Sequence, residues 1–139
     1  MDILYAEDIG HYWKTGKSSP DRWIDLAIIQ IEDIGGYIIS QAFGQDGTGK
    51  AVYMLAFDID SEQYKIIWPV LPSKTNNQSA SRIQAATMLY HDVKAKCMSA
   101  AVLGTRTAFF SFLVLPDGRT AASVANPELI RTLPLLLRE

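Results

Sequence analysis

The stretch that decides the fold is residues 80–103, A-S-R-I-Q-A-A-T-M-L-Y-H-D-V-K-A-K-C-M-S-A-A-V-L. It contains no glycine or proline and is rich in residues that favour helices. Its apolar side chains recur at steps of three and four and form one continuous stripe, made of Ile83, Ala86, Tyr90, Val93, Cys97 and Ala101. Gly104 stands where a left-handed C-terminal cap would end the helix. The pattern predicts one long helix over about 80–103 with its stripe packed across a sheet.

Four segments that precede this helix have the composition of strands. Residues 23–32, 37–43, 51–58 and 63–70 are rich in β-branched and aromatic side chains. Polar or glycine-containing links separate them, and each link is short. Short links favour pairing between successive strands, so the sequence predicts an antiparallel meander.

Two further strands and two flanking helices complete the expected fold. Residues 107–115 predict a fifth strand, Pro116-Asp117-Gly118 a hairpin turn, and residues 119–124 a short return strand. A short helix is expected before Gly16, and a last helix begins at Asn126-Pro127-Glu128 and runs to about 137. The predicted class is α+β, with an antiparallel sheet of five or six strands, the long helix across one face, and short terminal helices.

Size and composition restrict the cellular setting. The chain has 139 residues, of which 48% are apolar and 20% charged, so we expect a single domain over 1–139. Its longest apolar run is about six residues, far fewer than the ~20 that cross a bilayer, so no membrane partner is expected. The first residues lack a basic start and an apolar stretch, and Cys97 is the sole cysteine. These features favour a cytoplasmic protein.

One loop resembles a nucleotide-binding motif. Residues 44–50, G-Q-D-G-T-G-K, match the first seven positions of the phosphate-binding loop. The next position is Ala51 where the motif needs Ser or Thr for magnesium, and a strand follows where the mechanism needs a helix. The context therefore predicts a glycine-rich hairpin loop.

The remaining candidates for chemistry are weak. Asp58, Asp60 and Glu62 alternate at a strand end and are typical of a solvated turn, since calcium loops need more ligands. His91 and Cys97 lie six residues apart on one helix and point about 120° away from each other, which disfavours a nucleophile pair. His11 adds no recognisable metal pattern. We expect no catalytic residue, cofactor or metal site, and a non-enzymatic role is favoured.

Charge divides unevenly along the chain. Residues 1–70 hold eleven acidic and five basic side chains, whereas residues 71–139 hold eight basic and four acidic ones. A basic face would be expected from Lys74, Arg82, Lys94, Lys96 and Arg106. Cations combined with nearby aromatic rings are typical of proteins that bind single-stranded nucleic acid. Such binding is the alternative function, and the overall pI of 5.6 argues against it.

Aromatic and leucine-rich segments favour a different function, which is binding to another protein chain. Trp68-Pro69-Val70-Leu71-Pro72 and the segment 133–137 are apolar and would make protein contacts wherever they are exposed. We therefore expect a small interaction or structural module that acts by self-association or by binding a protein partner.

Overall fold

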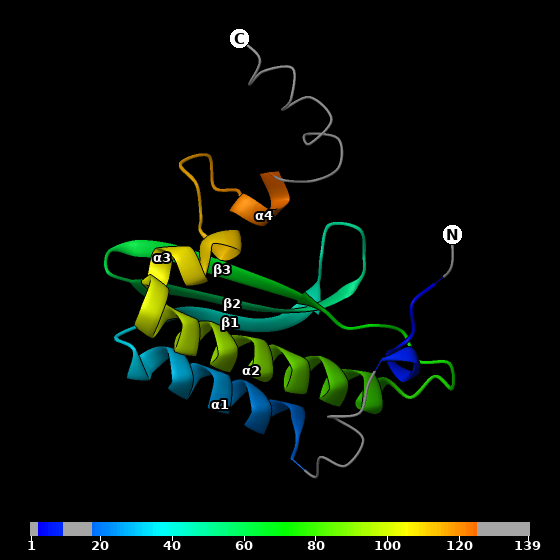
Figure 1. Cartoon of the computed structure of the whole chain (residues 1–139). Helices are drawn as coiled ribbons and strands as arrows, with labels where there is room; N and C mark the ends of the chain where they lie inside the picture. Colours follow the sequence, from blue (N-terminus) through cyan, green and yellow to red (C-terminus); the bar gives the residue numbers. More distant parts are fainter. Residues whose placement is uncertain (1–2, 10–17, 125–139) are drawn as a thin grey trace.

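The structure is a computed structural model that describes residues 3–9 and 18–124. Two layers make up its centre: a three-stranded antiparallel sheet, and a pair of helices on one face of that sheet (Figure 1). The helices are α1 (Pro20–Asp33) and α2 (Gln78–Leu103), which run side by side in the same direction (Figure 1). The predicted α+β class is confirmed.

The sheet is the expected meander, but with fewer strands. It contains β1 (Tyr37–Gln45), β2 (Ala51–Ile59) and β3 (Glu62–Pro69) in the order β1-β2-β3. Both pairs are antiparallel, with Phe43 opposite Tyr53 and Met54 opposite Ile67. The predicted five or six strands are wrong: within the described residues the sheet has three.

The first missing strand, residues 23–32, is a helix. Its isoleucine content suggested a strand, but Ser19 caps the segment by accepting a hydrogen bond from the Arg22 N–H at 3.2 Å, and Pro20 takes the first helical position. Ile24, Ala27 and Ile31 then lie on one buried side at helical spacing. Packing of this side against the core outweighs the β propensity of the isoleucines.

The long helix is confirmed, and it begins slightly earlier than predicted. Asn77 caps α2 by accepting from the Ala80 N–H at 3.0 Å, and Gly104 follows its end with a φ of 87°. Leu89, Val93 and Cys97 are buried, whereas Ala101 at the end of the predicted stripe is exposed. The core therefore occupies the first three quarters of this helix.

The predicted strand 107–115 is also wrong. The chain forms α3 (Thr105–Ala108) and the 3-10 helix η2 (Phe110–Phe112), and the predicted return strand contains α4 (Ala121–Val124). Phe109 explains the difference, because its fully buried ring packs edge-on against two sheet aromatics, at 5.7 Å from Phe57 and 5.9 Å from Tyr64. Phe109 lies between α3 and η2, and these two short helical turns hold its ring in the core.

The remaining predictions concern the hairpins and the ends of the chain. The turn at 116–118 is confirmed, with the Leu115 N–H donating to the Arg119 carbonyl at 2.7 Å. The 3-10 helix η1 (Ala6–Asp8) lies inside the predicted first helix, and the rest of that helix falls largely outside the described residues. The predicted last helix, from 126 to 137, lies wholly outside them. None of the helices in the described part combines the length and apolarity needed to span a bilayer.

Candidate functional site

The first candidate surface is the free edge of β1. This nine-residue strand pairs with β2 on one side, and no segment of the described chain pairs with its other side. Eight of its nine residues are exposed, and it contains neither a charged residue nor a proline. Proteins usually protect edge strands with charges, prolines, bulges or a covering segment. Here one irregularity, between Ile38 and Ser40, leaves the rest of the strand regular.

The hairpin geometry identifies the backbone groups that face outward. The Asp46 N–H donates to the Lys50 carbonyl at 2.8 Å, so this pair is hydrogen-bonded across the hairpin. Hydrogen-bonded and non-hydrogen-bonded pairs alternate along an antiparallel ladder. It follows that Gln41, Phe43 and Gln45 direct their N–H and C=O groups away from β2, toward the free edge.

The same hairpin loop is the one that resembled a nucleotide-binding motif. The Asp46 carboxylate accepts hydrogen bonds from the Thr48 N–H at 2.8 Å, the Thr48 hydroxyl at 2.6 Å and the Lys50 N–H at 3.0 Å. These bonds lower the pKa of Asp46, with the Thr48 hydroxyl as the largest cause. The N–H groups of Thr48, Gly49 and Lys50 thus donate within the hairpin, and the prediction of a hairpin loop is confirmed.

The opposite edge of the sheet is partly covered. The Val114 N–H donates to the Gln63 carbonyl at 2.9 Å, and Leu113 forms an isolated bridge with Tyr64. Pro69 also removes a donor from the end of β3. The two edges of the sheet therefore differ, and β1 offers the longer open ladder.

A shallow cavity of about 300 Å³ lies between the first turns of α1 and the strands β1 and β2. Its lining comprises Asp21, Ile24, Asp25, Gln41, Ala42, Phe43, Tyr53 and Met54. Phe43 and Tyr53 pack with ring centroids 5.0 Å apart and form the apolar part of its wall. Asp21 and Asp25 bring two exposed carboxylates to the same space beside β1.

The structure places the five predicted cations in different surroundings. Lys74 pairs with Asp8 at 2.6 Å, Lys96 with Asp92 at 3.2 Å, and Arg106 with Glu62 at 2.9 Å. Hydrogen bonds to these carboxylates raise the pKa of Lys74 and of Arg106. Three of the five positive charges are therefore compensated locally.

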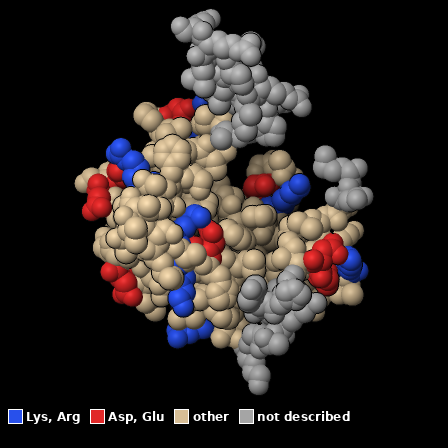
Figure 2. All heavy atoms as spheres, viewed as in Figure 1, with Lys and Arg blue, Asp and Glu red and all other residues tan. Residues whose placement is uncertain are grey.

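Helical geometry separates the cations on α2. A helix turns by about 100° per residue, so Arg82 and Lys94 project about 120° apart and Lys94 and Lys96 about 160° apart. Lys74 precedes α2 and Arg106 follows it, at opposite ends of a 26-residue helix. Figure 2 shows Lys and Arg side chains on this face interspersed with Asp and Glu. The five cations are not gathered on one side of the helix.

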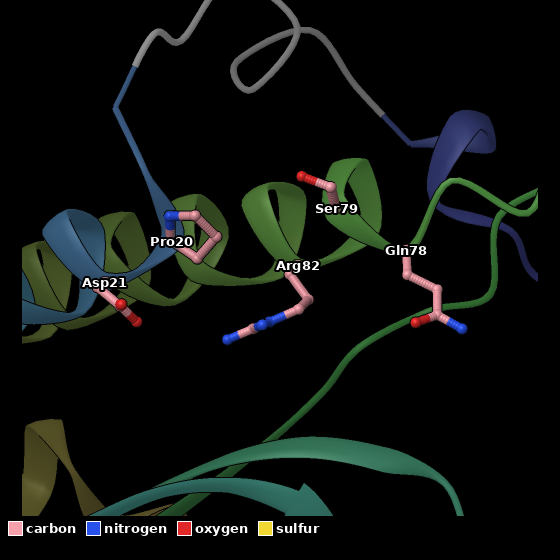
Figure 3. Close-up of a pocket in the computed structure, with 5 residues that line it drawn as sticks. All are labelled: Pro20, Asp21, Gln78, Ser79 and Arg82. Atoms are coloured by element: carbon pink, nitrogen blue, oxygen red, sulfur yellow. The ribbon is translucent and has the colours of Figure 1, made fainter.

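Arg82 is held between α2 and the sheet. Its Nε donates to the Tyr53 hydroxyl at 3.1 Å, and its guanidinium lies 4.1 Å from the centroid of the Phe43 ring. A second cavity of about 310 Å³ adjoins it, lined by Pro20, Asp21, Gln78, Ser79 and Arg82 (Figure 3). Arg82 thus braces the inner side of the β1 hairpin.

A second candidate surface covers the end of α2. Met98, Val102 and Leu103 are 68%, 84% and 59% exposed, and Phe110 of η2 is 55% exposed. Met98 and Val102 are four residues apart and lie on the same side of the helix. Exposed large apolar side chains such as this pair are typical of contact surfaces.

Few side chains in the described part of the chain could act as a nucleophile, a general base or a metal ligand. Burial raises the pKa of the Cys97 thiol to about 11, and its Sγ–H points to the Gln30 carbonyl at 3.5 Å. The exposed His91 ring lies 5.9 Å from Trp23 and 5.2 Å from Tyr90. Within residues 3–9 and 18–124, no three metal-ligating side chains of the His, Cys, Asp and Glu types converge.

Sequence reasoning missed the β1 edge because of a single error. Residues 23–32 were expected to form a strand, which would have paired with β1 and buried its edge. The signal that could have prevented this error is Ser19-Pro20-Asp21, an N-cap, a first-turn proline and a first-turn acid in succession. Once α1 is a helix, β1 becomes an edge strand.

Comparisons of this chain with protein-family models, with curated proteins and with solved structures found no match.

Proposed function

We propose that this protein is an interaction module that binds an extended segment of a partner protein along the free edge of β1. The observation that carries the proposal is the uncharged, exposed ladder of β1, with the outward backbone groups of Gln41, Phe43 and Gln45. A partner strand that pairs with such an edge gains main-chain hydrogen bonds, while pockets for alternate side chains supply selectivity. The cavity beside Phe43 is one such pocket.

The test uses amide hydrogen exchange, because strand addition changes particular amides. In the free protein, the N–H groups of Gln41 and Phe43 should exchange quickly, and those of Ala42 and Gly44, which point to β2, slowly. The probes are capped nine-residue peptides with alternating valine, in which the other positions are all Lys, all Thr or all Glu. At least one peptide should slow exchange at Gln41 and Phe43.

A matched pair of variants controls this experiment. Gln41→Pro removes an outward N–H at a position where an edge strand tolerates proline, whereas Gln41→Ala keeps the N–H and removes the side chain. Peptide binding should be lost in Gln41→Pro and retained in Gln41→Ala. If none of the three peptides protects Gln41 and Phe43, the proposed function is wrong.

Self-association is a second candidate, and the exposed end of α2 favours it. A second copy could cover Met98, Val102 and Phe110, which would remove a sizeable apolar area from water. This mode leaves β1 free, so it is compatible with binding of a partner at the edge.

Binding of single-stranded nucleic acid remains the alternative proposal. Arg82 and Lys94 support it, because neither forms an ion pair with a described residue. The local pairing of Lys74, Lys96 and Arg106 reduces the charge available for phosphates. Titration of labelled single-stranded DNA at two salt concentrations tests it, since phosphate contacts give affinity that falls steeply with salt.

A further inference from the structure

We infer that the strand added to β1 carries Lys or Arg on the side that faces α1, so that the partner is a basic extended segment. This inference rests on the proposed function and adds the chemical class of the partner. Its basis is the arrangement of charge on α1 relative to the open edge, together with the absence of charge on β1 itself.

The position of α1 fixes which side chains of an added strand would lie near it. Ile31 of α1 lies beside Gly36, the residue that precedes β1, and Ile59 of β2 also lies beside Gly36. Near the other end of β1, Asp21, Ile24 and Asp25 line the cavity that Gln41 and Phe43 also line. Because α1 lies beneath β1, every second side chain of a neighbouring strand would project toward the outer flank of this helix.

That outer flank is acidic. At about 100° per residue, Ile24 and Ile31 define the sheet-facing side of α1, and Trp23 defines the side that contacts Tyr90 of α2. Beyond the sheet-facing side, away from α2, the helix presents the three carboxylates of Asp21, Asp25 and Glu32. All three residues are exposed, and none forms an ion pair with a described residue.

The same charges disfavour a second copy at this edge. Antiparallel pairing of two β1 strands about a two-fold axis would place the two α1 helices next to each other beneath one continuous sheet. Their acidic flanks would then face across the junction, and like charges in that position oppose association. A strand that brings Lys or Arg gains attraction from the same carboxylates.

On the side of the sheet that faces away from α1, the neighbours of an added strand are mostly uncharged. On that side, the regular part of β1 presents Ser40, Ala42 and Gly44, which pair with Ala56, Met54 and Val52 of β2, and beyond the irregularity Tyr37 pairs with Asp58. None of the six residues in the regular part is charged, and Asp58 adds one carboxylate at the far end. The segment that fits best therefore alternates basic residues with uncharged ones.

The experiment compares the three peptides of the previous test by fluorescence anisotropy with the intact protein. The Lys peptide should bind about tenfold more tightly than the Thr peptide at low salt, and the difference should shrink as salt screens the charges. The Glu peptide should bind most weakly. Equal affinities for the Lys and Thr peptides, with protection at Gln41 and Phe43 retained, would overturn the inference and leave the proposed function standing.

Variants of α1 assign the effect to the proposed carboxylates. Asp25→Asn should weaken binding of the Lys peptide severalfold and leave the Thr peptide unchanged. Asp33→Asn is the matched control, because it also removes one carboxylate from α1, at a position about 180° from Ile24 and so on the side opposite the sheet. A comparable loss in Asp33→Asn would attribute the preference to net charge alone and overturn the inference. Without peptide, the amides of Gln41 and Phe43 could instead become more protected from exchange as the protein concentration rises. That result would identify a second copy of the chain as the segment that pairs with β1.

Discussion

Gly36, where the chain leaves α1 and enters β1, has no space for a side chain. A Cβ atom at this position would lie 2.7 Å from the Ile31 carbonyl oxygen and 3.2 Å from Cγ1 of Ile59, and it would also collide with the Ile31 side chain. We expect Gly36→Ala to lower the free energy of unfolding by about 1–3 kcal/mol, as overpacking of a core does. Urea denaturation measures this change.

Gly44 provides the control for Gly36. It lies in β1, and a Cβ atom there would meet nothing within 4 Å. Gly44→Ala should leave stability unchanged or raise it by up to about 1 kcal/mol, because alanine restricts the unfolded chain. Equal losses in the two variants would contradict the steric explanation.

Cys97 should react slowly in the folded protein. It is 6% exposed, and burial raises its thiol pKa to about 11, so little thiolate is present at pH 8. We expect iodoacetamide to modify Cys97 slowly without denaturant and quickly in concentrated urea. Mass spectrometry over time measures both rates, and rapid modification of the folded protein would show that the thiol is accessible.

At the scale of elements, η1 is held in place by carboxylates. Glu7 accepts hydrogen bonds from the Ser73 hydroxyl at 2.6 Å and from the Lys74 N–H at 2.7 Å, and the Ala6 N–H donates to the Pro72 carbonyl at 2.9 Å. The bond from Ser73, and then that from Lys74, lower the pKa of Glu7. The folded state therefore stabilises the ionised form of Glu7 relative to the protonated form.

This preference has a definite pH dependence. A lowered carboxyl pKa contributes stability that is present above the unfolded pKa, about 4.3 for Glu, and is lost as the pH falls through the folded value. We expect the Ala6 amide to be protected near neutral pH and to exchange faster, relative to its intrinsic rate, as the pH falls below about 4. Glu7→Gln should weaken this protection at neutral pH, whereas Glu32→Gln, at an exposed site on α1, should not.

The elements that sequence reasoning predicted correctly are those whose local signals agree with their packing. In α2, helix formers, an apolar stripe and the final Gly104 indicate one structure, and the strands β1 to β3 are joined by short turns. Residues 23–32 and 107–115 were predicted to be strands because isoleucine and phenylalanine favour strands. In the structure both segments are helical, and Ile31 and Phe109 are buried in a core made largely by residues distant in sequence. The amino-acid composition of a short segment does not reveal contacts with residues that are distant in the sequence.

For the candidate site, the sequence identified the cations but not their partners. The spacing of Arg82, Lys94 and Lys96 was visible, whereas the ion pair of Lys74 with Asp8 joins residues far apart in the chain. The pair of Arg106 with Glu62 does so too. Both pairs link the acidic first part of the sequence to the basic second part, so an uneven charge along the chain becomes a mixed surface in the fold (Figure 2).

At the scale of the whole molecule, the exposed end of α2 predicts weak self-association. Dimer content should rise with protein concentration, and Met98→Ser with Val102→Ser should reduce it, because both side chains are more than half exposed and contribute apolar contact area. Sedimentation equilibrium measures the change. Ile29→Ser, at an apolar residue of α1 that is 43% exposed, is the control and should leave the dimer content unchanged. A wild-type protein that stays monomeric at all concentrations would contradict this prediction.

The side-by-side packing of α1 and α2 also has a consequence for how the chain assembles. The whole sheet lies between these helices in sequence, so their contact closes a long loop, whereas each hairpin closes a short one. Closing a long loop costs more chain entropy, and contacts between distant residues slow folding. We therefore expect the hairpins to form first and the docking of α1 to complete the native structure.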